Sequence, residues 1–166
     1  KASDRGTIAA PRIVPAGHAI GITGVHGDAG GLAPGILERG TESGVADGVD
    51  EVIKAVRYQI KHGAKVIKIF ATAGVLSMEG PVGAQQMTAE EIQAAVDEAA
   101  RHGIRVAAHA HGTEGIIAAV KAGVASIEHG SMLTDEAIEL MKQHGTFLVP
   151  TIYLTERVDV TKLPPL

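Results

Sequence analysis

Three residues that could bind a metal ion lie at equivalent positions in three similar segments of the sequence. Each follows a glycine by five or six residues, and the pairs are Gly63 with Lys68, Gly103 with His109, and Gly123 with His129. The residues between each glycine and its potential ligand are mainly apolar, as in a buried strand. Because equivalent positions on neighbouring strands lie at the same height, this spacing predicts that the three side chains meet. Imidazole nitrogens are ordinary zinc ligands, so we predict a metal site.

Lys68 needs its own explanation, because it lies between Ile67 and Ile69 in the apolar segment "KVIKIF". An unpaired buried ammonium group costs several kcal/mol, and it would repel a metal cation. One interpretation is a strand at the sheet edge, where the aliphatic stem is covered while the amine reaches water. In the other, burial lowers the pKa of the amine, which then adds CO₂. The resulting carbamate is a long carboxylate able to bridge two cations, and we favour this second interpretation.

Strand alternation adds a third histidine to the predicted site. His109 and His111 are two residues apart, so they point to the same face of a strand, whereas Glu128 is predicted to point away from its neighbour His129. A single histidine at a strand end is more often a hydrogen-bonded structural residue than a ligand. The coincidence of His109, His129 and Lys68 favours the metal site. The other histidines are expected in turns or at exposed helix ends, and these are His18, His62, His102 and His144.

The elements that would position these residues repeat along the chain. Four segments run from a helix end through a glycine into an apolar strand: "IKHGAKVIKIF", "ARHGIRVAAHA", "VKAGVASIEHG" and "MKQHGTFLVPT". Glycine is the preferred residue just after a helix, where the backbone becomes left-handed. Threonines at 88, 113 and 134 are predicted to cap the helices that precede the last three segments. A further strand is expected at about 19–25.

This alternation of strand and helix predicts an α/β fold with a parallel sheet, either part of a TIM (β/α)₈ barrel or an open doubly wound sheet. We count about five strands in 166 residues, whereas a full barrel has eight strands and takes about 250 residues. A barrel would therefore be incomplete. Two long connections, at 26–48 and 71–87, follow strands. They therefore lie at the carboxyl ends of the strands, where sites occur in parallel α/β folds.

Composition excludes several classes of function. The net charge is −4 and no basic run is present, which argues against nucleic acid and against an anionic membrane surface as partners. No apolar stretch approaches the roughly 20 residues that cross a bilayer. The chain has no cysteine, so any metal must be held by histidine, carboxylate or a modified side chain. We expect a cytoplasmic protein. Because the chain does not begin with Met, a signal peptide on a longer parent protein stays an open alternative.

Three motifs together resemble strands four, five and six of the amidohydrolase superfamily: "VIKIFATAGVLS", "VAAHAHG" and "SIEHG". The resemblance is strongest to its imidazolonepropionase-like branch, which includes prolidases (Xaa-Pro dipeptidases) and zinc carboxypeptidases. The intervals agree, with 41 residues from Lys68 to His109 and 20 from there to His129. The upstream segment "ITGVHGD" is similar to the strand-three motif of that branch.

The resemblance implies a (β/α)₈ barrel that binds one or two Zn²⁺ ions or another divalent metal. Lys68 would be the carboxylated bridge, and His109 and His129 would ligate the second metal. His111 would contact the carboxylate of the substrate, and His26 would reach the scissile carbonyl. The implied reaction is hydrolysis of an amide bond, in a dipeptide or N-acyl amino acid, by a water that the metal activates.

The superfamily's strand-one His-x-His pair and strand-eight aspartate have no counterpart in this sequence. Residues 1–166 are therefore predicted to be the central part of a longer barrel, strands three to seven, with strands one, two and eight absent. We expect this chain alone to be inactive, and its unpaired edge strands to favour a homo-oligomer or aggregation. Two alternatives stay open: a deaminase or cyclic amidohydrolase of the same superfamily, and a non-catalytic α/β module that binds an anion in its glycine-rich loop.

Overall fold

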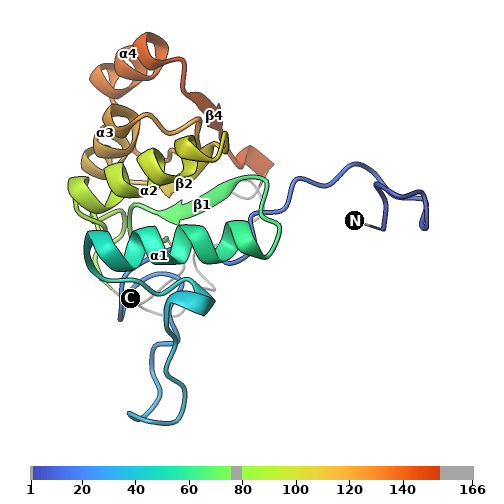
Figure 1. The fold of residues 1–166 in the computed structure, drawn as a ribbon. Helices are drawn as coiled ribbons and strands as arrows, with labels where there is room; N and C mark the ends of the chain where they lie inside the picture. The colour runs from blue at the N-terminus through green and yellow to red at the C-terminus, as the bar shows by residue number, and fades with distance from the viewer. Residues whose placement is uncertain (1, 76–79, 154–166) are drawn as a thin grey trace.

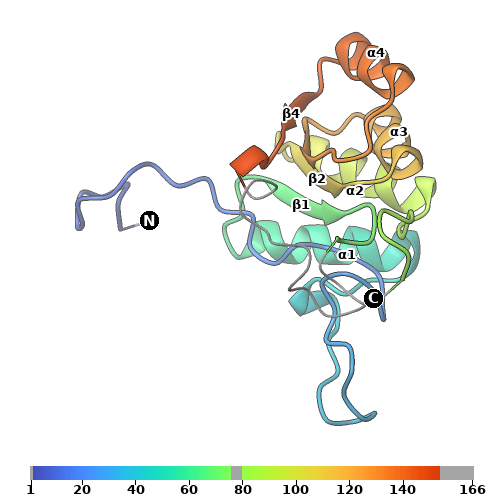
Figure 2. The ribbon, with the colours of Figure 1, turned by 180° about the vertical axis from the view of Figure 1, so that it is seen from behind.

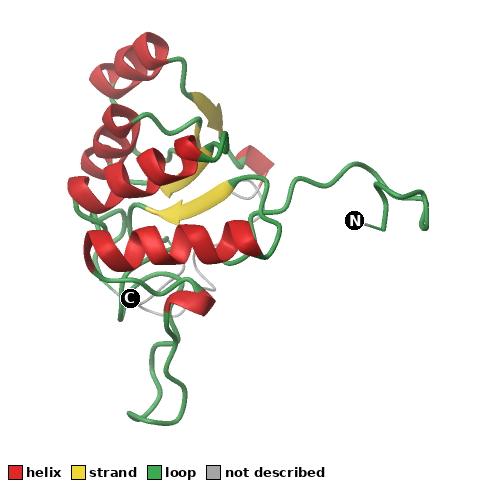
Figure 3. Ribbon diagram, viewed as in Figure 1, coloured by secondary structure: helices red, strands yellow, loops and turns green. Residues whose placement is uncertain are grey.

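The computed structural model describes residues 2–75 and 80–153, and it shows an α/β fold (Figures 1 and 3). The elements in chain order are η1 (Thr41–Ser43), α1 (Gly48–Lys61), β1 (Ile67–Phe70), α2 (Ala89–Arg101), β2 (Val106–Ala110), α3 (Thr113–Ala122), β3 (Ser126–His129), α4 (Asp135–His144) and β4 (Phe147–Val149). Within the described residues, no helix is both long and apolar enough to cross a membrane.

The four strands form one parallel sheet whose spatial order, β1-β2-β3-β4, is the order in the sequence. Crossovers between neighbouring parallel strands are right-handed, so successive helices fall on the same face of the sheet. Figures 1 and 2 show the helices side by side along that face, and α1 packs on α2, α2 on α3 and α3 on α4. A doubly wound sheet would carry helices on both faces. The arrangement is that of part of a TIM barrel, which confirms the first of the two predicted architectures.

The helix ends mostly follow the sequence prediction. Thr88 forms a capping box with Glu91, and the Thr134 hydroxyl accepts a hydrogen bond from the Ala137 N–H. Thr113 was the wrong cap for α3, because Gly112 takes that position and the Thr113 hydroxyl donates to the Met132 carbonyl instead. A left-handed glycine lies one or two residues after each helix, as predicted, and these are Gly63, Gly103, Gly123 and Gly145.

Burial differs between the centre and the edges of the sheet. Side chains that face the helices are fully buried, as for Ile67 and Ile69 of β1 and Ile127 of β3. The apolar pattern predicted buried strands, and β2 comes nearest to this, with four of its five residues buried. Lys68 on β1 is half-buried, and all three residues of β4 are exposed. The prediction fails most clearly at β4, the outermost strand among the described residues, because four strands do not close into a barrel.

The strand predicted at 19–25 is reduced to isolated bridges. Ile20 exchanges two backbone hydrogen bonds of 2.8 Å with β1, and Gly21 bridges to Val45. Beyond this point the chain turns, because the Asp47 carboxylate accepts hydrogen bonds from both the N–H and the hydroxyl of Thr23. These bonds to a side chain replace the ladder that a longer strand would need. Residues 76–79 of the second predicted connection lie outside the described residues.

Candidate metal centre

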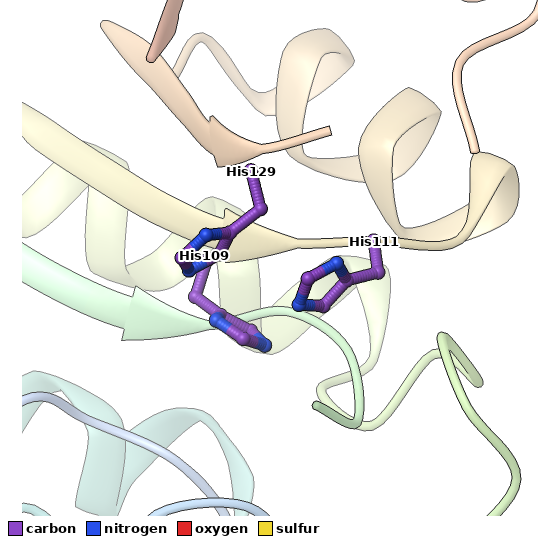
Figure 4. A group of neighbouring side chains, drawn as sticks. All are labelled: His109, His111 and His129. Carbon is purple, nitrogen blue, oxygen red and sulfur yellow. The ribbon is translucent and has the colours of Figure 1, made fainter. Parts of the chain in front are cut away.

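Three imidazoles converge at the carboxyl ends of β2 and β3 (Figure 4). His109, His111 and His129 each place one ring nitrogen within 4.8 Å of the other two. His109 and His111 are buried, with 4% and 3% of their surface exposed, and His129 is half-buried. The spacing argument predicted that His109 and His129 would meet, and the structure brings His111 into the same cluster.

His129 enters the cluster through an unusual backbone conformation. The sheet register pairs it with Ala110, so regular alternation would direct its side chain away from the face that carries His109. Its φ of 76°, in the left-handed region, ends the strand and turns the ring back. The imidazole then stacks on His111 with centroids 4.8 Å apart and meets His109 edge-on, also at 4.8 Å. A non-glycine residue in this region costs on the order of 1 kcal/mol.

Glu128 lies on the same side of the sheet as the cluster, so the prediction that it points away was wrong. The register pairs Glu128 with His109, and residues paired across parallel strands share a face. The Ser126 hydroxyl donates to one Glu128 oxygen over 2.7 Å. The alternation argument failed because the left-handed backbone at His129 breaks the alternation on which it relied.

Lys68 does not lie at a sheet edge. Its strand is hydrogen-bonded to β2 on one side, and on the other side the Ile20 N–H donates to the Lys68 carbonyl. The structure therefore does not support the edge interpretation of this lysine. Burial lowers the pKa of the amine, and the nearby Glu128 carboxylate opposes that change only in part. Lys68 also lowers the pKa values of His109 and His129 through its charge, which places it beside the cluster.

The cluster presents neutral imidazoles at physiological pH. Burial, followed by the neighbouring cationic groups, lowers the pKa of His109 to about 3, and burial lowers that of His111 to about 4. The Nε2 atom of His109 is buried and has no hydrogen-bond partner among the described residues. Neutral imidazole nitrogens that converge are a donor set that zinc binds, and the unsatisfied Nε2 could bind a metal, so the residues fit a metal ion.

His26 reaches the cluster from the loop that follows the bridge at Gly21. Its ring stacks on His109 with centroids 4.5 Å apart and meets the edge of Phe70 at 4.7 Å. Gly27 permits this packing: its φ is +99°, and a Cβ there would lie 2.3 Å from the Phe70 ring. The structure thus brings His26 into contact with His109, and its role at the scissile carbonyl stays a prediction.

Three hydroxyl residues that the sequence analysis missed contact the histidines. Thr72 accepts a hydrogen bond from the His111 N–H over 2.9 Å, Ser131 pairs with His111 Nδ1 over 2.8 Å, and Thr151 pairs with His129 Nδ1 over 2.5 Å. Each lies two positions after the last residue of a strand, namely β1, β3 and β4. Their place just beyond the carboxyl ends of the strands was the signal that could have found them.

The chain belongs to the amidohydrolase family, whose model matches residues 1–164. Among its relatives is ochratoxinase from Aspergillus niger, which is 42% identical over 165 residues covering 91% of this chain and 34% of ochratoxinase. A solved Xaa-Pro dipeptidase with bound methionine is 43% identical and superposes with a TM-score of 0.91 over 99% of this chain. A prolidase complexed with N-methylphosphonate-L-proline is 38% identical, with a TM-score of 0.83 over 99% of the chain.

The chain spans only part of these relatives: 34% of ochratoxinase, 42% of the Xaa-Pro dipeptidase chain and 43% of the prolidase chain. The resemblance inferred from the three motifs is confirmed at the level of the family and of the partial barrel. The roles of individual residues stay predictions.

Proposed function

We propose that the protein that carries this chain is a metal-dependent amidohydrolase that cleaves the amide bond of a dipeptide or N-acyl amino acid. The observation that carries the proposal is the cluster of three neutral imidazoles, in which the buried Nε2 of His109 has no hydrogen-bond partner among the described residues. Similarity to an Xaa-Pro dipeptidase and to a prolidase supports a peptide-like substrate over the deaminase alternative. The cluster also favours an enzyme over the anion-binding module.

In this proposal Lys68, His109 and His129 hold the metal, which we take to be zinc because the donors are imidazoles and a carboxylate-like group. When bound, zinc supplies a Lewis acid that polarises a carbonyl and makes water nucleophilic near pH 7. The lowered pKa of Lys68 supports the required modification. Its neutral amine adds to CO₂, a C–N bond forms, and a proton leaves to solvent, which yields the carbamate.

His111 and His26 are assigned to the substrate. Ser131 and Thr72 hold His111 at Nδ1 and at its backbone N–H, respectively, which leaves Nε2 to face a ligand. Because its pKa is lowered to about 4, His111 is neutral at pH 7 and would bind a substrate carboxylate by donating a hydrogen bond from Nε2 rather than by charge. His26 is assigned to the scissile carbonyl, and its stacking on His109 supports that assignment.

We propose further that the 166-residue chain supplies strands three to seven of the barrel and is inactive alone. The strand-one His-x-His pair and the strand-eight aspartate that the resemblance implies have no counterpart in it. This agrees with the 34–43% of the relatives' length that the chain spans.

The test uses the longest polypeptide that carries this sequence, beside the 166-residue chain alone. Both are assayed on Xaa-Pro dipeptides, N-acetyl amino acids and ochratoxin, before and after removal of metal with a chelator and reloading with zinc. We expect hydrolysis by the longer protein that chelation abolishes and zinc restores. His109→Gln should lower kcat/KM at least about 100-fold, while His144→Gln, an exposed position at the end of α4, should not change it.

Three results would contradict separate parts of the proposal. Hydrolysis that survives full removal of the metal would refute a metal-dependent mechanism. Turnover by the 166-residue chain alone would refute its inactivity. Unchanged zinc stoichiometry after loading in bicarbonate-free buffer would refute the carbamate on Lys68.

A further inference from the structure

We infer that Thr151 is a positioning residue that fixes the ring orientation and the tautomer of His129, so that His129 Nε2 faces the other two histidines. This inference rests on the metal centre proposed above. Its basis is the hydrogen bond between Thr151 Oγ1 and His129 Nδ1, which joins residues 22 positions apart in the sequence.

The backbone supports a specific role for this contact. Among the described residues, two that are not glycine have positive φ, and they are the two partners: His129 at 76° and Thr151 at 41°. Threonine is β-branched, and such residues strongly disfavour this region. Strain of this kind persists where the surroundings over-determine a conformation, often at a functional site. Both strained residues lie at carboxyl ends of neighbouring strands, β3 and β4, where their side chains meet.

The ring geometry shows what the hydrogen bond controls. With Nδ1 occupied by Thr151, Nε2 is the ring nitrogen left for a ligand. The ring lies 10° from parallel with His111 and 73° from the plane of His109, and Figure 4 shows it between the ends of β2 and β3. If the hydroxyl accepts the Nδ1 proton, Nε2 keeps its lone pair for a metal. Ligating histidines commonly donate their second ring N–H in this way, and loss of the partner costs roughly 10- to 100-fold in metal affinity.

Thr146 provides a matched control. It is also a threonine beside β4, at the residue before the strand, and it is buried. Its hydroxyl donates to the backbone carbonyl of Val124 over 3.0 Å rather than to a histidine. Thr146→Val removes a structural hydroxyl, whereas Thr151→Val removes one that contacts His129.

The experiment compares wild type with Thr151→Val, Thr151→Ser, Thr151→Gly and Thr146→Val in the longest polypeptide that carries this sequence. Zinc affinity is measured by competition with a chromophoric chelator. The tautomer of His129 in the metal-free protein is read from long-range ¹H–¹⁵N correlations of its ring. Wild type should carry the proton on Nδ1. Thr151→Val should move it to Nε2 and weaken zinc binding about 10- to 100-fold, and Thr151→Ser should stay within about threefold of wild type.

The melting temperatures of these variants distinguish a positioning role of Thr151 from a purely structural one. Glycine adopts a φ of 41° without strain, so Thr151→Gly should melt no lower than Thr151→Val and still lose zinc affinity to the same extent. Thr146→Val should lower the melting temperature and keep zinc affinity. The inference is overturned if Thr151→Val binds zinc as tightly as wild type, or if wild-type His129 carries its proton on Nε2. If the wild-type protein binds no zinc, the proposed metal centre is refuted. The tautomer of His129 in the metal-free protein would still decide the role of Thr151.

Discussion

His109 is a neutral imidazole because its surroundings oppose a positive charge. Burial contributes most, and His26, His111, His129 and Lys68 add unfavourable charge, so that its pKa falls to about 3. The unfolded chain has the ordinary pKa of about 6.5 at this position. As pH falls through this window, the unfolded state takes up a proton that the folded state does not. The contribution of His109 to the free energy of unfolding is therefore complete above about pH 6.5 and is lost progressively as the pH falls toward 3.

This difference predicts a pH-dependent stability that His109 controls. Between pH 6.5 and pH 5 the metal-free protein should lose about 2 kcal/mol of its free energy of unfolding through His109, from 1.5 pH units at about 1.36 kcal/mol each. His109→Gln should remove most of that loss. The measurement is urea unfolding of both proteins at pH 7 and pH 5, with His144→Gln as the control at an exposed helix end. Equal losses in wild type and His109→Gln would contradict the prediction.

At the scale of single residues, regular spacing predicted where side chains lie, whereas an irregular backbone conformation could not be predicted. The distances from the glycines at 63, 103 and 123 placed Lys68, His109 and His129 at one end of the sheet. Glu128 was misplaced because no sequence pattern announces the left-handed conformation of its neighbour. The hydroxyl of Thr151 was missed, because threonine has no chemical signature of its own and only its place just beyond β4 marks it.

Glu91 joins the beginnings of two helices. One of its carboxylate oxygens accepts from the Thr88 N–H at the start of α2, and the other accepts from the Gly48 N–H at the start of α1, both over 2.7 Å. The residue before α1, Asp47, makes no capping bond within that helix because its carboxylate accepts from Thr23. Glu91 is buried, so it supplies an acceptor that the first turn of α1 would otherwise lack.

We predict that Glu91→Ala is more destabilising than loss of an ordinary cap. It removes the carboxylate that accepts from the Gly48 and Thr88 N–H groups, and hydrogen bonds to a charged group contribute more than ordinary ones. The free energy of unfolding should therefore fall by about 2–3 kcal/mol, against about 1 kcal/mol for Thr88→Ala. Glu90→Ala, at an exposed position in the same turn, should cost less than about 1 kcal/mol. Urea unfolding of the three variants checks this order. A Glu91→Ala loss no larger than that of Thr88→Ala would count against the shared cap.

Whole elements were predictable wherever glycine marked a boundary. The helix–glycine–strand repeat located all four named strands and the helices before them. The segment at 19–25 had a strand-like composition, yet hydrogen bonds from Thr23 to Asp47 end its pairing. Such a contact joins residues 24 apart, and local composition carries no information about it.

On the scale of the whole molecule, the sheet ends in an exposed apolar strand. β4 pairs only with β3 among the described residues, and its side chains are 70%, 40% and 47% exposed at Phe147, Leu148 and Val149. Ile152 and Tyr153, which follow β4 in the sequence, are also exposed, by 63% and 68%. An open strand edge with apolar side chains pairs readily with another chain.

The isolated 166-residue chain should therefore self-associate. Sedimentation velocity at increasing concentration should show oligomers, and Phe147→Lys should shift the distribution toward monomer, because charged residues on an edge strand prevent pairing. Val49→Lys is the matched control, since Val49 is 40% exposed on α1, away from β4. A wild type that stays monomeric at all concentrations, or a Val49→Lys variant that dissociates equally, would contradict an interface at β4.

The partial barrel could be foreseen from strand number and chain length, because parallel βα units leave few topologies. What covers the outer edge of β4 could not be foreseen, because an edge that is unpaired among the described residues does not itself specify a partner.

The in-order pairing of β1, β2 and β3 has a consequence for biosynthesis. Every proposed metal ligand comes from one continuous stretch that begins at Lys68 and finishes at His129. Each of these strands can dock on the one made just before it while the ribosome is still adding residues, and domains generally acquire structure in that direction. The proposed metal ligands can thus come together on a nascent polypeptide before the residues that follow β3 are translated.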